Sequence, residues 1–131
     1  MIKIDQDTQW IYMTRSDTEN IIFGAKDKIT GDPYVPKLKD RLIFSAAKKV
    51  GDDPLVKIEN EMVDDAESFW NIRFEPEDTE SLPFGKYAYD VELQIRNSVT
   101  GELEDRKTII GKTDTISPTL VIWGEVTKES E

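Results

Sequence analysis

Carboxylates are the only abundant side chains in this chain that could act as acid or base catalysts. Its 131 residues include 27 Asp and Glu but no histidine and no cysteine. Catalytic groups of the Ser-His-Asp or Cys-His type are therefore excluded, as are disulfides and zinc sites built from Cys and His. Gly85, Gly111 and Gly124 are isolated from one another, so a glycine-rich phosphate loop is also missing.

Two pairs of adjacent acids, Asp52-Asp53 and Asp64-Asp65, remain as candidates for carboxylate chemistry. A glycosidase needs two carboxylates that flank one bond, and a calcium loop needs alternating oxygen ligands closed by a glutamate. Adjacent loop residues point apart, and the calcium-loop pattern is absent. We interpret both pairs as solvated loop charge and predict no catalytic residue, no metal site, no cofactor and no enzymatic activity.

Aromatic residues are the second group that could bind something. Trp10 and Tyr12 alternate with aliphatic residues, so their strand is apolar on both sides and either lies centrally or contacts another molecule. Trp123 shares a face with Val121, while the opposite face is also apolar. Core burial is the first interpretation for each aromatic residue, Trp70 included. The second interpretation makes Trp10, Tyr12 and Trp123 candidate interface residues, because aromatic side chains anchor protein interfaces.

The charge balance restricts the partners. The net charge is -10, charged residues make up 34% of the chain and apolar residues 37%. Nucleic acids and anionic membrane surfaces attract basic faces, so we predict neither as a partner. The N-terminus lacks the apolar core of a secretory signal, and no apolar run is long enough to span a bilayer. We expect a soluble protein made in a cytoplasm.

A period of two residues dominates the sequence. Tyr87, Tyr89, Val91, Leu93 and Ile95 form one face of a segment whose other face is charged. Side chains alternate across a strand, so the pattern predicts a half-buried strand. Further strands are expected at 10–14, 21–25, 42–47, 56–58, 70–74, 107–111 and 120–125.

Turn residues separate these segments at 30–33, 51–54 and 97–101. Pro76 followed by acidic residues predicts one short helical turn. About seven to nine short strands with regular turns are typical of a sandwich or barrel. Alternation with one wet face favours antiparallel sheets. We therefore predict a single all-β domain over residues 1–131, an antiparallel β-sandwich of two sheets, with a frayed tail from about residue 127.

The segment from Leu82 to Tyr87 is similar to a tyrosine corner, in which an early strand tyrosine bonds back to the backbone between two sheets. Gly85 would allow the chain to turn and Leu82 would fill the core below. This interpretation favours Greek-key connections. The alternative is a buried aromatic residue at the start of a strand.

Several segments together resemble the small immunoglobulin-like proteins and domains encoded among tail and baseplate genes of phages and prophages of Gram-positive bacteria. The likeness is carried by Arg15-Ser16-Asp17-Thr18, residues 27–34, 40–46, 74–79, 82–93 and 107–111. This chain departs from the family at two places. Ser16 replaces the usual glycine, and Pro118 interrupts the final strand.

The resemblance implies an immunoglobulin-like Greek-key sandwich and a structural protein of the virion, which multimerises or docks onto neighbouring subunits. It implies no active site. The main alternative is a carbohydrate- or cell-surface-binding module that uses Trp10, Tyr12 or Trp123 as a stacking platform. An enzyme that uses only carboxylates is the third hypothesis, and it requires two acids with raised pKa in one cleft.

Overall fold

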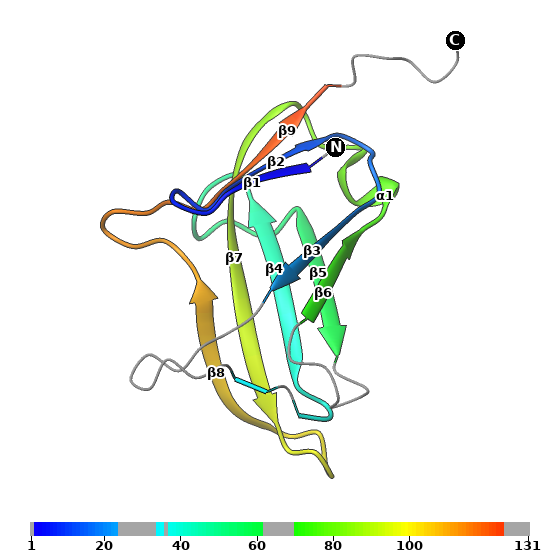
Figure 1. Cartoon of the computed structure of the whole chain (residues 1–131), viewed down its shortest axis with the longest axis vertical. Coiled ribbons are helices and arrows are strands. Elements are labelled where there is room, and N and C mark those ends of the chain that lie inside the picture. The colour runs from blue at the N-terminus through cyan, green and yellow to red at the C-terminus, as the bar shows by residue number, and fades with distance from the viewer. Residues whose placement is uncertain (1, 24–33, 36, 62–69, 125–131) are drawn as a thin grey trace.

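One large sheet and one two-stranded sheet make up almost the whole structure (Figure 1). The computed structural model describes residues 2–23, 34–35, 37–61 and 70–124. Its elements are β1 (Ile2–Asp5), β2 (Trp10–Thr14), β3 (Glu19–Phe23), β4 (Arg41–Ala47), β5 (Val56–Glu61), β6 (Trp70–Phe74), α1 (Pro76–Thr79), β7 (Gly85–Arg96), β8 (Leu103–Ile110) and β9 (Thr119–Trp123). The all-β prediction is confirmed. Ala25, the turn at 30–33, Asp64-Asp65, the Trp70 side chain and the tail lie outside the described part of the chain.

The long strand β7 organises the large sheet, whose order is β1-β2-β9-β7-β4-β5. On one side β7 pairs with β4, and on the other it pairs first with β9 and then with β8. Tyr87, Tyr89, Val91 and Leu93 are buried, as their spacing predicts. The first six residues of β8 are exposed, and β8 is an edge strand that pairs only with β7 (Figure 1).

The expectation of purely antiparallel sheets is wrong at one place, because β2 and β9 are parallel. Parallel neighbours need a long crossover connection, and nearly the whole chain separates these two strands. β1, which the sequence patterns did not predict, adds to β2 in antiparallel register. Beyond the Pro118 interruption, β9 is therefore paired on both sides, with β2 and with β7.

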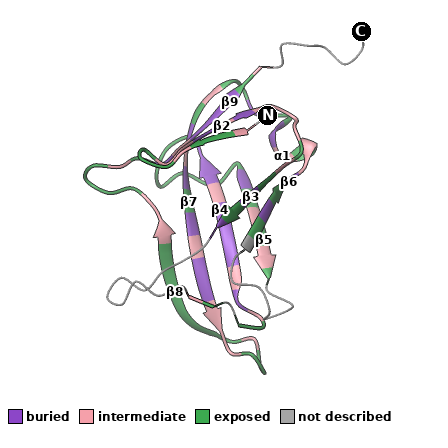
Figure 2. Ribbon diagram, viewed as in Figure 1, coloured by how far each residue is buried: buried purple, intermediate pink, exposed green. Residues whose placement is uncertain are grey.

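The core lies between the two sheets, where β4 and β7 are largely buried (Figure 2). It centres on Phe44 of β4, which is fully buried. Its ring is stacked on Tyr89 with centroids 5.2 Å apart, and it meets Phe74 of the small sheet edge-on at 5.2 Å. Phe23 approaches from β3 at 6.5 Å. Offset and edge-to-face aromatic pairs are favourable geometries, so this cluster joins the two layers.

The connection from the small sheet to β7 has the predicted local structure. Pro76 begins the single helical turn α1, and the Asp78 carboxylate accepts a hydrogen bond from the Glu75 backbone N–H at 2.8 Å. The Tyr87 hydroxyl then donates to the Pro83 carbonyl at 2.5 Å, which is the bond expected of a tyrosine corner. Leu82 is buried beneath the corner, as predicted.

A buried carboxylate fixes the end of the sheet nearest the β7–β8 hairpin. Asp40 is fully buried just before β4. It accepts hydrogen bonds from the Tyr34 hydroxyl at 2.5 Å, from the Lys37 backbone N–H at 2.9 Å and from the Arg96 backbone N–H at 2.9 Å. Burial and the adjacent Asp40 carboxylate raise the pKa of Tyr34, which therefore stays a donor. Asp40 thus ties the start of β4 to the end of β7.

Ser16 has a left-handed backbone, with φ of 69°. Its backbone N–H donates to the Thr79 hydroxyl at 2.8 Å, which fixes this conformation against α1. Such a backbone costs an ordinary residue about 1 kcal/mol. Ser16→Gly is therefore expected to raise the free energy of unfolding by about 0.5–1 kcal/mol in a urea titration. Ser16→Ala should give no gain, and a glycine variant less stable than the parent would contradict the reason given.

Candidate functional site

Trp10, Tyr12 and Trp123 form one contiguous aromatic patch on the outer face of the large sheet. The Trp10 and Tyr12 rings are 6.1 Å apart, and the Tyr12 and Trp123 rings are 5.2 Å apart. The parallel pairing of β2 with β9 places Thr14 opposite Trp123, so Tyr12 lies diagonal to that tryptophan. Diagonal neighbours on one face of a sheet are within reach of aromatic side chains.

The patch lies on the sheet face that points away from the core, because side chains alternate between the two faces of a strand. Ile11 and Met13 of β2 are buried against the core, so Trp10 and Tyr12 point the other way. Trp123 is 41% exposed, and the other two rings are half-buried. The Lys86 ammonium lies 5.0 Å from the centre of the Trp10 ring, a cation–π distance.

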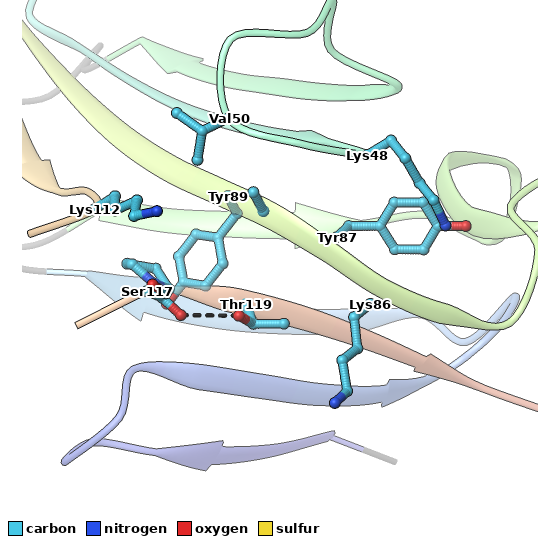
Figure 3. A pocket seen from close by; sticks show the side chains of 10 residues that line it. Lys48, Val50, Lys86, Tyr87, Tyr89, Lys112, Ser117 and Thr119 are labelled. Atoms are coloured by element: carbon cyan, nitrogen blue, oxygen red, sulfur yellow. Dashed lines mark hydrogen bonds between the residues drawn. The ribbon is translucent and has the colours of Figure 1, made fainter. Parts of the chain in front are cut away.

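A hollow of about 260 Å³ (Figure 3) lies next to this patch, because its lining residue Thr119 is paired with Trp10. Its floor is β7 around Ala88, and its walls are the β4–β5 and β8–β9 connections. It is lined by Lys48, Val50, Lys86, Tyr87, Ala88, Tyr89, Lys112, Ser117, Pro118 and Thr119. Two lining residues adjoin the patch, because Thr119 is paired with Trp10 across β2 and β9 and the Lys86 ammonium lies over the Trp10 ring. We call this hollow the lysine hollow.

The small side chain of Ala88 and a change of strand partner make the hollow. The β4–β7 pairing ends at Ala47 and Ala88, and the β7–β9 pairing also ends at Ala88. The Tyr89 backbone N–H then donates to the Pro118 carbonyl at 3.3 Å, which holds the β8–β9 connection against the floor.

The hollow is positively charged although the chain is acidic. Lys48, Lys86 and Lys112 come from three separate segments, and none of the ten lining residues is acidic. The three side chains are exposed. Among the described residues, no ion pair involves any of them. The Lys48 ammonium lies 5.4 Å from the centre of the Tyr87 ring (Figure 3).

Tyr89 supports the floor from the core side. Its side chain is 6% exposed, and its hydroxyl donates to the Gln9 carbonyl at 2.7 Å, which connects β7 to the β1–β2 turn. Burial raises the pKa of Tyr89 to about 12 from its ordinary value of 10.0. The neutral phenol is therefore the form that the folded state prefers.

This pKa predicts a loss of stability in alkali. The stabilisation is complete below pH 10.0, where the tyrosine of the unfolded chain is still protonated, and it falls as the pH rises toward about 12. In denaturant titrations at several pH values, Tyr89→Phe should lose less stability than the parent over this range, by about 1–2 kcal/mol. Burial also raises the pKa of Tyr87, so the comparison is between the two proteins. Equal losses in both would contradict the prediction.

The acids do not gather at this site. Asp52 and Asp53 are exposed in the β4–β5 connection. Asp90 has a pKa raised first by burial and then by the charge of Glu92, and it does not line the hollow. In the described ranges, no group of three or more acidic residues could hold a metal ion. None of the described helices is long and apolar enough to cross a membrane.

Comparisons with protein-family models, with curated proteins and with solved structures give no match.

Sequence reasoning named the aromatic residues but not the lysines. Trp10, Tyr12 and Trp123, proposed separately from two distant segments, are brought together by the β2–β9 pairing. The lysine hollow gave no sequence signal, because its lysines are scattered along the chain and each resembles ordinary surface charge. Only the folded arrangement shows that they line one hollow.

Proposed function

We propose that this chain is a non-enzymatic structural protein of a phage or prophage virion, part of the tail or baseplate. It would be made in the bacterial cytoplasm and act by docking onto a neighbouring protein subunit. The observation that carries the proposal is the aromatic patch, which occupies the outer face of the sheet with Trp123 41% exposed. Tryptophan and tyrosine are the side chains that most often anchor protein interfaces.

Local features support the immunoglobulin-like Greek-key relationship that the resemblance implies. The bond from Tyr87 to Pro83 has the form of a tyrosine corner. The left-handed backbone of Ser16 occurs at the family's usual glycine. Arg15 also contacts the corner, because its guanidinium lies 4.2 Å from the centre of the Phe84 ring. Two segments that carry the resemblance therefore meet in space.

The docking partner is a different virion protein rather than a second copy. Two copies would each carry a net charge of -10, and like charges oppose association at long range. β1 is the terminal strand of the sheet beside the patch, and its outer edge offers backbone groups to an added strand. A neighbour could use the edge and the rings together.

Carbohydrate binding is the second candidate, because three aromatic rings follow one another across the sheet face and aromatic rings stack on sugars. Successive rings are tilted by 43° and 41°, however, so they present no flat platform. Calorimetric titration with cell-wall polysaccharides tests this candidate. Binding heat that disappears in Trp10→Ala would favour it over protein docking.

Mass spectrometry of purified particles tests the leading proposal. The particles are induced from the host and purified by density gradient, and the chain is quantified against known tail proteins. We expect a fixed copy ratio in every preparation. Absence of the chain from particles would refute the proposal, whereas self-association of the purified chain in light scattering would identify a second copy as the partner.

A further inference from the structure

We propose that the lysine hollow is a carboxylate-binding site, which receives an acidic side chain of the docking partner. Lysines from three separate segments line one concave space of about 260 Å³, and none of the other lining residues is acidic. The chain has 17 Lys and Arg against 27 Asp and Glu. A concave region that excludes acids is therefore a local reversal of the charge of the whole protein.

The three lysines have no other evident task in the part of the chain that the structure describes. Their side chains are exposed, and none forms an ion pair there. The ammonium groups of Lys48 and Lys86 lie 5.4 Å and 5.0 Å from the centres of the Tyr87 and Trp10 rings, and these cation–π contacts supply no counter-charge. A carboxylate in the hollow would supply the missing counter-charge.

The lining favours a carboxylate over a phosphate group. Phosphate sites commonly use arginine forks or backbone N–H groups at a helix N-terminus. The lining residues include neither an arginine nor a helical residue. The volume lies below the range of roughly 300–1,000 Å³ that is usual for drug-sized ligands. The space therefore suits one side chain better than an extended polymer.

Position favours a carboxylate that belongs to a protein. Lys86 and Thr119 of the lining both adjoin Trp10, so a subunit that covers Trp10 also reaches the hollow. This step rests on the proposed docking function. It adds that the partner presents an aspartate or glutamate beside its contact with the rings, and that the charge pair fixes the register of docking.

Nuclear magnetic resonance titration of the full chain at low salt tests the site directly. The probe is a triglutamate peptide with an acetylated N-terminus and an amidated C-terminus, and a triglutamine peptide is the neutral comparison. We expect saturable shifts of the Ala88, Thr119 and Lys112 amide signals with triglutamate only. No saturable shift, or equal shifts with triglutamine, would overturn the proposal.

Two variants locate the binding. In K48Q/K86Q/K112Q the dissociation constant of triglutamate should rise about tenfold or more, since each exposed charge pair contributes modestly and three are lost. Ala88→Leu fills the hollow and keeps all three charges, and it should weaken binding comparably. Retention of the parent affinity in both variants would overturn the proposal.

A matched variant separates local from overall charge. K49Q/K57Q/K107Q also removes three lysines outside the hollow, so its net charge falls from -10 by the same amount. Its triglutamate affinity should change no more than about twofold. A loss equal to that of the first variant would show unspecific attraction and overturn the site.

Two other anions test the class of ligand. Inorganic phosphate that binds as tightly as triglutamate would make this a general small-anion site, and trigalacturonate that binds tenfold more tightly would assign it to acidic glycans. Either result would overturn the proposed protein carboxylate. The titration is independent of particle composition, so the docking function and the carboxylate site can fail separately.

Discussion

Replacement of Asp40 by alanine is expected to lower the free energy of unfolding by about 3 kcal/mol or more. The substitution removes the acceptor of three hydrogen bonds at a fully buried position. A hydrogen bond to a charged group contributes about 1.5–3 kcal/mol. The Tyr34 hydroxyl and the backbone N–H groups of Lys37 and Arg96 would all lose their bond to Asp40 at once.

Urea unfolding measures this effect as a lower midpoint with an unchanged slope. Asp40→Asn retains the size and one acceptor oxygen, so its loss should lie between those of the parent and Asp40→Ala. Asp53→Ala, in an exposed loop, should stay within about 0.5 kcal/mol of the parent. An alanine variant at position 40 that stays within about 1 kcal/mol of the parent would show that Asp40 does not hold β4 to β7.

Trp123→Ala is expected to have a large effect on docking and a small effect on folding. Truncation of an anchoring tryptophan commonly costs about 2 kcal/mol or more of binding free energy, which is roughly thirtyfold in affinity. The side chain is 41% exposed and contacts Tyr12, so the free energy of unfolding should fall by only about 1 kcal/mol. Particles produced with the variant should therefore contain far less of the chain.

A control for this variant lies on the small sheet. Ile22 is 65% exposed on β3, away from the aromatic patch, so Ile22→Ala should enter particles at the parent level. Quantitative mass spectrometry of both particle preparations compares them. Normal incorporation of Trp123→Ala, or equal loss in both variants, would show that the aromatic patch is not the docking surface.

Local patterns predicted those parts of the fold that local chemistry decides. The alternation through β7 marked its buried face, since side chains alternate in any strand. Pro76 marked the start of α1, and the segment from Leu82 to Tyr87 marked the corner, because both structures form between residues close in sequence. Strand β1 was not predicted, and none of its four residues is buried, so it lacks the kind of buried face that marked β7.

Long-range pairing could not be predicted in this way. The parallel pairing of β2 with β9 joins segments more than a hundred residues apart, and no pattern within either strand specifies its neighbour. Asp40 resembled an ordinary loop acid until its three donors were placed around it. In the candidate site, apolar alternation predicted the aromatic residues from the sequence. Only the folded chain shows that Lys48, Lys86 and Lys112 line one hollow.

Hydroxyl-radical footprinting of intact particles tests the central claim most directly, because it asks whether the outer aromatic face is covered in the assembled state. Oxidation of Trp123 is measured by mass spectrometry in the free chain and in the particle, with Ile22 as an internal reference for exposure. We expect Trp123 to be oxidised readily in the free chain and at least several-fold more slowly in the particle, while Ile22 changes little. Equal oxidation of Trp123 in both states would show that the aromatic face stays open to solvent and is not the docking surface.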